Sequence, residues 1–167
     1  KGDIFIVNSK GGEARQLTTH QAYDCHPIWS PDGKTIAFSS TRDGAMDLFT
    51  VPITGGTPKR LTSFTGSAIP ESFTPDGKEI LFRTAIMPEQ DYSQFPNGSQ
   101  VFSISVDGGR PKPFLSFEAY NIHFDKTGHR IIYHDRKGFE DEWRKHHTSS
   151  ICRDIWIHDL QTGEFTN

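Results

Sequence analysis

The residues with the most evident capacity for chemistry lie in one polar segment near the C-terminal end of the sequence. There His146 and His147 follow three acidic side chains, Glu140, Asp141 and Glu142, a composition that would suit a metal site. However, adjacent histidine side chains diverge on an extended strand, and these carboxylates pair equally well with the basic residues that follow them. We therefore predict no metal ligand and interpret the segment as an interaction loop, with these candidate residues: Glu140, Asp141, Trp143, Arg144, His146 and His147.

A second group of reactive side chains lies near the N-terminus, in what we expect to be a loop between strands. It comprises His20, Asp24, Cys25 and His26. A cysteine–histidine nucleophile would also need an orienting group and an oxyanion hole. We favour loop packing and loop hydrogen bonds instead. The other cysteine is Cys152, and the sequence leaves open whether the two pair, since two cysteines make no disulfide framework.

Motifs typical of catalysis or cofactor binding are absent from the sequence. It contains no G-x-S-x-G, H-E-x-x-H, P-loop or G-x-G-x-x-G pattern, so we predict no catalytic residue, no cofactor and no metal. With 18 basic and 21 acidic residues it lacks the charge footprint of a nucleic-acid binder. Apolar runs are far shorter than a membrane span. The glycosylation sequon at 97–99 also suits a turn before a strand, which we favour, and the compartment stays open.

The sequence repeats itself, and this repetition predicts the fold. The segment WSPDGK at 29–34 recurs as FTPDGK at 73–78 and, more weakly, as FDKTGH at 124–129. Pro and Asp fit the two central positions of a turn, and Gly takes the left-handed conformation that closes a hairpin. Asp32 and Asp76 therefore belong to turn chemistry.

Four short strands and two tight turns fill each period of about 44 to 54 residues. No window has the 3.6-residue apolar stripe of a helix. A repeat of this length with four strands is typical of a β-propeller blade. We predict an all-β chain, a propeller of four-stranded antiparallel blades, present as roughly three and a half blades. The predicted parts are a partial blade at 1–18, full blades at about 23–62 and 67–115, and a partial blade at about 119–167, which ends with its third strand.

Recurrent aromatic residues are predicted to pack between blades, because each blade face must be buried against its neighbour. These residues are Phe5, Trp29, Phe38, Phe49, Phe73, Phe82, Phe102, Phe124, Tyr133 and Trp156. Insertions fall only between the second and third strands of a blade, at 85–99 and 135–153. Trp143 in the longer insertion has no counterpart in the other blades. It either anchors a partner or pins its own loop, and the sequence leaves both alternatives open.

The repeat resembles that of TolB-like and tricorn-protease-like propellers, the WD40-like PD40 repeat. The resemblance rests on WSPDGK followed by IAFSS, and then on D-x-F-x-V, G-G and L-T. The stretch EWRKHHTSS at 142–150 is similar to the N-terminal propeller of tricorn-like serine peptidases, whose later domains include a PDZ module and a tail-specific-protease-type catalytic domain. The resemblance implies that the parent is a hydrolase active in proteolysis, and that this segment is its non-catalytic propeller for peptide access or domain scaffolding.

Two other functions compete with this reading. One is a TolB-like protein–protein binding propeller with no attached protease. The other is a propeller enzyme with acids or histidines in its central channel, but the positions at 27–28, 71–72 and 122–123 share no polar group. We therefore rank the enzyme last. The expected partners are other domains of the parent chain and peptide substrates.

Three and a half blades are fewer than closed propellers have. We therefore expect an open fragment whose end blades expose apolar faces and strand edges. Either the parent chain supplies more blades, or the fragment associates with itself through these open ends.

Overall fold

The fold consists of β-strands and the turns that join them. The computed structural model describes residues 2–63, 66–84, 99–135 and 154–167, and in these residues all regular secondary structure is β-strand. One sheet has two strands and three sheets have four, all antiparallel, and each four-stranded sheet follows the order of the chain. Such sheets are propeller blades, so the prediction of an all-β chain of four-stranded antiparallel blades is confirmed.

We call the two-stranded sheet the half-blade and the others the first, second and third blades. The half-blade contains β1 (Phe5–Ile6) and β2 (Arg15–Gln16). The first blade contains β3 (Asp24–Trp29), β4 (Thr35–Ser40), β5 (Asp47–Pro52) and β6 (Lys59–Arg60). The second contains β7 (Ile69–Phe73), β8 (Glu79–Thr84), β9 (Gln100–Ser105) and β10 (Lys112–Leu115). The third contains β11 (Tyr120–Phe124), β12 (Arg130–His134), β13 (Ile155–Asp159) and β14 (Phe165–Thr166).

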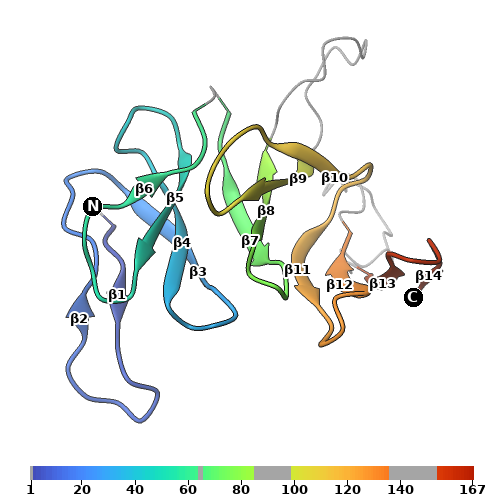
Figure 1. The fold of residues 1–167 in the computed structure, drawn as a ribbon, viewed down its shortest axis with the longest axis horizontal. Helices are drawn as coiled ribbons and strands as arrows, with labels where there is room; N and C mark the ends of the chain where they lie inside the picture. The colour runs from blue at the N-terminus through green and yellow to red at the C-terminus, as the bar shows by residue number, and fades with distance from the viewer. Residues whose placement is uncertain (1, 64–65, 85–98, 136–153) are drawn as a thin grey trace, which may run out of the picture.

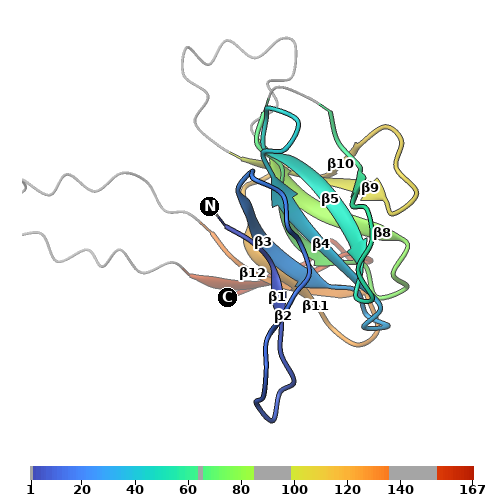
Figure 2. The same cartoon turned by 90° about the vertical axis from the view of Figure 1, so that its left-hand side faces the viewer.

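The sheets stand in a row, with the half-blade at one end and the third blade at the other (Figure 1). The view turned by 90° looks along this row, with the first blade in front of the second and third (Figure 2). Contacts between blades centre on β7, which packs against β3, β4 and β5 on one side and against β11 on the other. The described residues include no helix that could cross a membrane.

Apolar side chains fill the space between successive blades. Along β5, Leu48 joins a core cluster shared with the second blade, while Phe49 joins a cluster shared with the half-blade. This alternation follows from the period of two in a strand, because neighbouring side chains point to opposite faces of the sheet. A third cluster joins the second and third blades through Leu81, Val101 and Ile131. A blade with neighbours on both sides is therefore apolar on both faces.

The predicted turn chemistry is confirmed at the first hairpin of each four-stranded blade. Gly33, Gly77 and Gly128 have φ values of 67°, 70° and 75°, the left-handed region that favours glycine. The Gly33 amide donates to the Ser30 carbonyl at 2.9 Å, and the Gly77 amide to the Thr74 carbonyl at 2.8 Å. These turns are built from local residues, which is why sequence predicts them well.

Two of the predicted core aromatics are exposed instead. Trp29 is 54% exposed and Phe5 56% exposed, so the prediction that they pack between blades is wrong. Phe73 occupies the position of Trp29 in the next blade and is 5% exposed. The difference has a structural cause: a complete four-stranded sheet lies before Phe73, whereas only the half-blade lies before Trp29.

The third blade also has one strand more than the sequence predicted. Its fourth strand, β14, pairs with β13 through Ile157 and His158. The equally short β2 and β6 are followed by a Leu-Thr pair, at 17–18 and 61–62, whereas no such pair accompanies β14, which explains why it was not predicted. The half-blade and three full blades still amount to three and a half blades.

Candidate functional site

The predicted interaction loop lies outside the described residues. This applies to Glu140, Asp141, Trp143, Arg144, His146 and His147, and also to Cys152. Within the part of the chain that the structure describes, no group of three or more His, Cys, Asp or Glu side chains is arranged to hold a metal ion.

The second predicted group is only partly a loop. His20 precedes β3, and its Nδ1 accepts a hydrogen bond from the Ala22 amide at 3.1 Å, as expected for loop chemistry. Asp24, Cys25 and His26 lie instead on β3, where His26 has a φ of 52° at a β-bulge. The structure therefore corrects the expectation that all four residues belong to a loop.

Cys25 does not have the surroundings of a nucleophile. Its Sγ lies 3.1 Å from Nδ1 of His26. Burial, and next the nearby Asp24 carboxylate, raise the pKa of the Cys25 thiol. A reactive cysteine needs the opposite shift, because the thiolate is the nucleophilic form.

Asp24 holds the end of the first blade together. Its buried carboxylate accepts two hydrogen bonds from Nη2 of Arg42, at 3.0 and 2.9 Å, and one from the Ser40 hydroxyl at 2.5 Å. The Arg42 guanidinium also lies 4.8 Å from the centre of the Phe49 ring and 5.3 Å from that of Phe38. Both carboxylate oxygens of Asp24 are therefore occupied by structural contacts.

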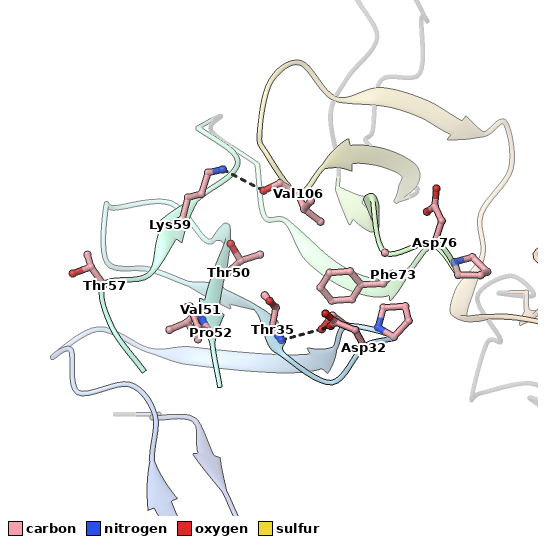
Figure 3. A pocket seen from close by; sticks show the side chains of 14 residues that line it. Asp32, Thr35, Thr50, Val51, Pro52, Thr57, Lys59, Phe73, Asp76 and Val106 are labelled. Atoms are coloured by element: carbon pink, nitrogen blue, oxygen red, sulfur yellow. Dashed lines mark hydrogen bonds between the residues drawn. The ribbon is translucent and has the colours of Figure 1, made fainter. Parts of the chain in front are cut away.

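A pocket of about 720 Å³ opens between the first and second blades, on the face that carries the tight hairpin turns (Figure 3). Its size is in the range of small-ligand sites. Apolar side chains contributed by both blades line it, Pro31 from the first turn of the first blade and Phe73 from β7 among them. Its polar lining residues include Asp32, Thr35, Thr50, Thr57, Lys59 and Asp76.

The two aspartates of the pocket come from the SPDG and TPDG turns. Asp32 Oδ1 accepts hydrogen bonds from the Ser30 hydroxyl at 2.6 Å and the Lys34 amide at 3.0 Å, and Asp76 Oδ1 accepts the equivalent pair. These bonds, with the hydroxyl contributing most, lower the pKa of both carboxyl groups. Both side chains are therefore anionic at neutral pH.

The basic side chain among the lining residues, Lys59, bridges the first and second blades at their outer edge. It lies on β6, and its Nζ donates to the backbone carbonyls of Val106 at 3.3 Å and Asp107 at 2.9 Å. The equivalent residue of the half-blade, Arg15, donates to the Ile53 carbonyl in the same way. An ammonium group has three donors, so Lys59 retains one beyond these two contacts.

The turns also make contact between blades. A Cβ built on Gly77 would lie 3.7 Å from Cδ of Pro31, and one built on Gly128 would lie 3.2 Å from Cγ of Pro75. The glycine of each later turn therefore sits against the proline of the turn before it. The pocket is thus bounded by a turn–turn contact and by the Lys59 bridge.

A polar network joins the second and third blades near the opposite ends of their strands. Arg83 pairs with the Glu71 carboxylate, whose second oxygen accepts from the Ile122 amide at 3.4 Å. The Arg83 guanidinium lies 4.3 Å from the centre of the Tyr120 ring, which stacks on His134. With its carboxylate paired inside this network, Glu71 has the environment of a structural residue.

Sequence reasoning did not select Lys59 or Arg83. The signal for Lys59 was its position in the repeat, where Arg15 and Lys112 are also basic. Its acceptor at Val106 is 47 residues away, and the Arg83–Tyr120 contact also joins separate blades. Such pairings require knowledge of how the blades pack.

Comparisons with known proteins agree with this architecture. The family model of the tricorn protease N-terminal β-propeller domain matches residues 1–167. The tricorn protease structure aligns with a TM-score of 0.72 at 24% identity, covering 98% of this chain and 16% of that one. A putative TolB from Agrobacterium tumefaciens aligns with a TM-score of 0.69 at 23% identity, over 98% of this chain and 55% of that one.

One curated relative shares a short part of the sequence. Dipeptidyl-peptidase 5 of Porphyromonas gingivalis is 39% identical over 46 residues, which are 28% of this chain and 7% of that protein. The chain thus spans only a small part of this relative and about half of the TolB protein. The structural likenesses are below 25% identity and establish the fold.

Proposed function

Since the chain belongs to the family of tricorn protease N-terminal β-propeller domains, we propose that it is the non-catalytic propeller of a tricorn-like serine peptidase. In this role it guides peptides to or from the catalytic domains, or holds those domains in place. The observation that carries the proposal is the family match over all 167 residues. The structure supports it because Asp24, Asp32 and Glu71 are engaged in ion pairs and turn hydrogen bonds, and Cys25 contacts the neighbouring His26.

The partners proposed for the chain are other parts of its parent protein and peptides. Exposed apolar side chains on the end sheets support the first of these. Phe5 is 56% exposed on the half-blade, and Ile155 is 62% exposed on the third blade. Apolar surface of this kind marks interaction sites, so these faces would pack against further blades or, in an isolated fragment, against another copy.

The experiment is a deletion in the full-length protein. Removing residues 139–150, which include the predicted interaction loop, should impair domain assembly or peptide turnover while the propeller stays folded. Peptide hydrolysis and analytical ultracentrifugation report the two functions, and circular dichroism reports folding. Unchanged turnover and unchanged assembly in a folded variant would contradict the proposed role.

A TolB-like binding propeller is the second candidate, supported by the TM-scores of 0.69 and 0.66 to two TolB structures. The two proposals differ in whether the full-length protein also contains a peptidase domain. A full-length protein that cleaves peptides and reacts with a serine-directed inhibitor supports the peptidase propeller. A full-length protein with neither property, which instead captures a protein partner, supports the TolB-like role.

A further inference from the structure

We propose that the pocket between the first and second blades binds a short peptide with free amino and carboxyl termini. This inference takes its ligand class, peptides, from the proposed function and rests on it in that respect, but binding is measured without a peptidase domain, so its failure would leave the family role of the propeller intact. It rests on how charge and apolar surface are arranged among the lining residues.

Opposite charges lie on opposite sides of this pocket. Figure 3 shows Asp32 and Asp76 on one side with Phe73 beside them, Lys59 and Thr57 on the other side, and Val106 and Thr50 between. A ligand that complements all three parts carries a cationic end, an apolar middle and an anionic end. A free peptide in its zwitterionic form has this order of groups.

The acidic side is well prepared to receive an ammonium group. Each aspartate uses Oδ1 for the hydrogen bonds within its own turn, as described for Asp32 and Asp76. For Asp76, Oδ2 has only a 3.9 Å contact with the Lys78 ammonium, which is 81% exposed, and so exposed a pair contributes little. Acceptor capacity therefore remains on this side, since a carboxylate has about four lone-pair sites.

The basic side is held in position by the neighbouring blade. The carbonyls of Val106 and Asp107 fix Nζ of Lys59 and leave its charge unneutralised, because carbonyls are uncharged. A ligand carboxylate supplies the opposite charge and takes the third donor. Between the charged sides, the partly buried Val106 packs against the core cluster that includes Phe73, so it offers a supported apolar surface to a ligand side chain.

The test is a binding titration on the full natural chain, followed by NMR or calorimetry. The probes are the tripeptide Ala-Leu-Phe and two relatives, one acetylated at its amino end and one amidated at its carboxyl end. We expect saturable binding of the free peptide and at least a tenfold loss of affinity for each blocked form. Affinity should also fall with salt, because the charged side chains are exposed.

Variants assign each end of the peptide to its partner. Replacing both aspartates, D32N with D76N, keeps the turn acceptors and should abolish only the effect of acetylation. Replacing the basic residue, with K59Q, should abolish only the loss of affinity that amidation of the carboxyl end causes. The controls are D125N, which changes a carboxylate in the first turn of the third blade, and K112Q, which changes the residue of the second blade equivalent to Lys59; neither residue lines this pocket, so both variants should bind like the wild type.

The outcomes are distinguishable even if a variant is less stable, because each variant is judged by which blocking group it ignores. The proposal is supported if each variant no longer distinguishes the free peptide from one blocked form but still distinguishes it from the other. The proposal is wrong if the free peptide fails to saturate the protein at 10 mM, a limit of about 3 kcal/mol in affinity. It is also wrong if blocking either terminus changes nothing, or if the control variants lose binding equally.

Discussion

Phe73 and Trp29 occupy the same position in two consecutive repeats, yet their surroundings differ. Each lies opposite an isoleucine of the next strand, Ile80 for Phe73 and Ile36 for Trp29. Phe73 is nevertheless 5% exposed and Trp29 is 54% exposed. Local sequence thus determines the position of a residue within its blade, whereas burial depends on the blade that lies in front of it.

The other face of the blades shows the same contrast. Leu48 and Val101 are fully buried by the blade that follows each of them, whereas the equivalent Ile155 of the third blade is 62% exposed. The energy of the fold is therefore concentrated between blades. Matched positions with and without a neighbouring blade should therefore respond differently to the same substitution.

Truncating the two aromatics should give the largest difference. We expect F73A to lower the free energy of unfolding by about 3–5 kcal/mol, because it leaves a cavity between two blades. W29A should cost about 1 kcal/mol, since half of the side chain is already in water. Urea titrations of both variants measure this, and equal losses would show that the face before Trp29 is covered in solution.

Alanine in the turn glycines should show a smaller difference. The backbone strain is similar in G33A and G128A, because both glycines have a positive φ, of 67° and 75°. Only Gly128 has a neighbour, with the Cβ site 3.2 Å from Pro75, whereas no atom lies within 4 Å of the Cβ site of Gly33. We expect G128A to cost about 1–3 kcal/mol more than G33A through overpacking.

A double variant tests the cause of that difference. Combining G128A with P75A removes the crowding atom, so the excess cost should largely disappear in a double-mutant cycle. An excess that persists in the double variant would assign it to the backbone instead. Thermal unfolding of the four proteins measures the coupling.

The contrast between local and inter-blade features also explains how far the sequence could be interpreted. The turns, the strand order and the number of blades follow from residues close together in the chain, and all were predicted. The blade count predicted exposed apolar faces at the ends of the fragment, but a repeat that treats every blade alike did not assign Trp29 and Phe5 to such faces. The two-residue β14 lacks the Leu-Thr pair by which the equally short β2 and β6 were recognised.

The candidate site was predicted less well than the fold. Asp32 and Asp76 were identified as turn residues, and their hydrogen bonds confirm that role. Their shared pocket with Lys59 was not predicted, because it forms only where two blades meet. The loop at 140–147 stays a prediction, since it lies outside the described residues.

Polar substitutions on the exposed face of the third blade should affect association more than folding. Ile155 and Ile157 are 62% and 41% exposed. We expect the double variant I155K with I157K to change stability by less than about 1 kcal/mol and to shift the 167-residue chain toward monomer. Light scattering measures this shift, with I155L as the control that keeps the apolar surface. A wild-type chain that is already a monomer would contradict the prediction.

The smallest effect concerns a carboxylate whose partners all belong to one blade. The backbone amide of Thr162 and then the side chain of Arg130, with the Gln161 amide, lower the pKa of Asp159 from 3.8 to about 2. A carboxyl group with a lowered pKa in the folded state contributes stability above its unfolded value, and this stability is lost as the pH falls toward the folded value. We therefore expect the thermal midpoint of the wild type to decrease as the pH is lowered from about 4 to about 2, partly through Asp159.

D159N should flatten this part of the pH profile of the thermal midpoint, and R130Q should flatten it less because the amide donors remain. Because these contacts lie within the third blade, covering its exposed face should leave the profile unchanged, in contrast to the inter-blade predictions above. A D159N profile parallel to that of the wild type would show that the turn hydrogen bonds do not stabilise the carboxylate.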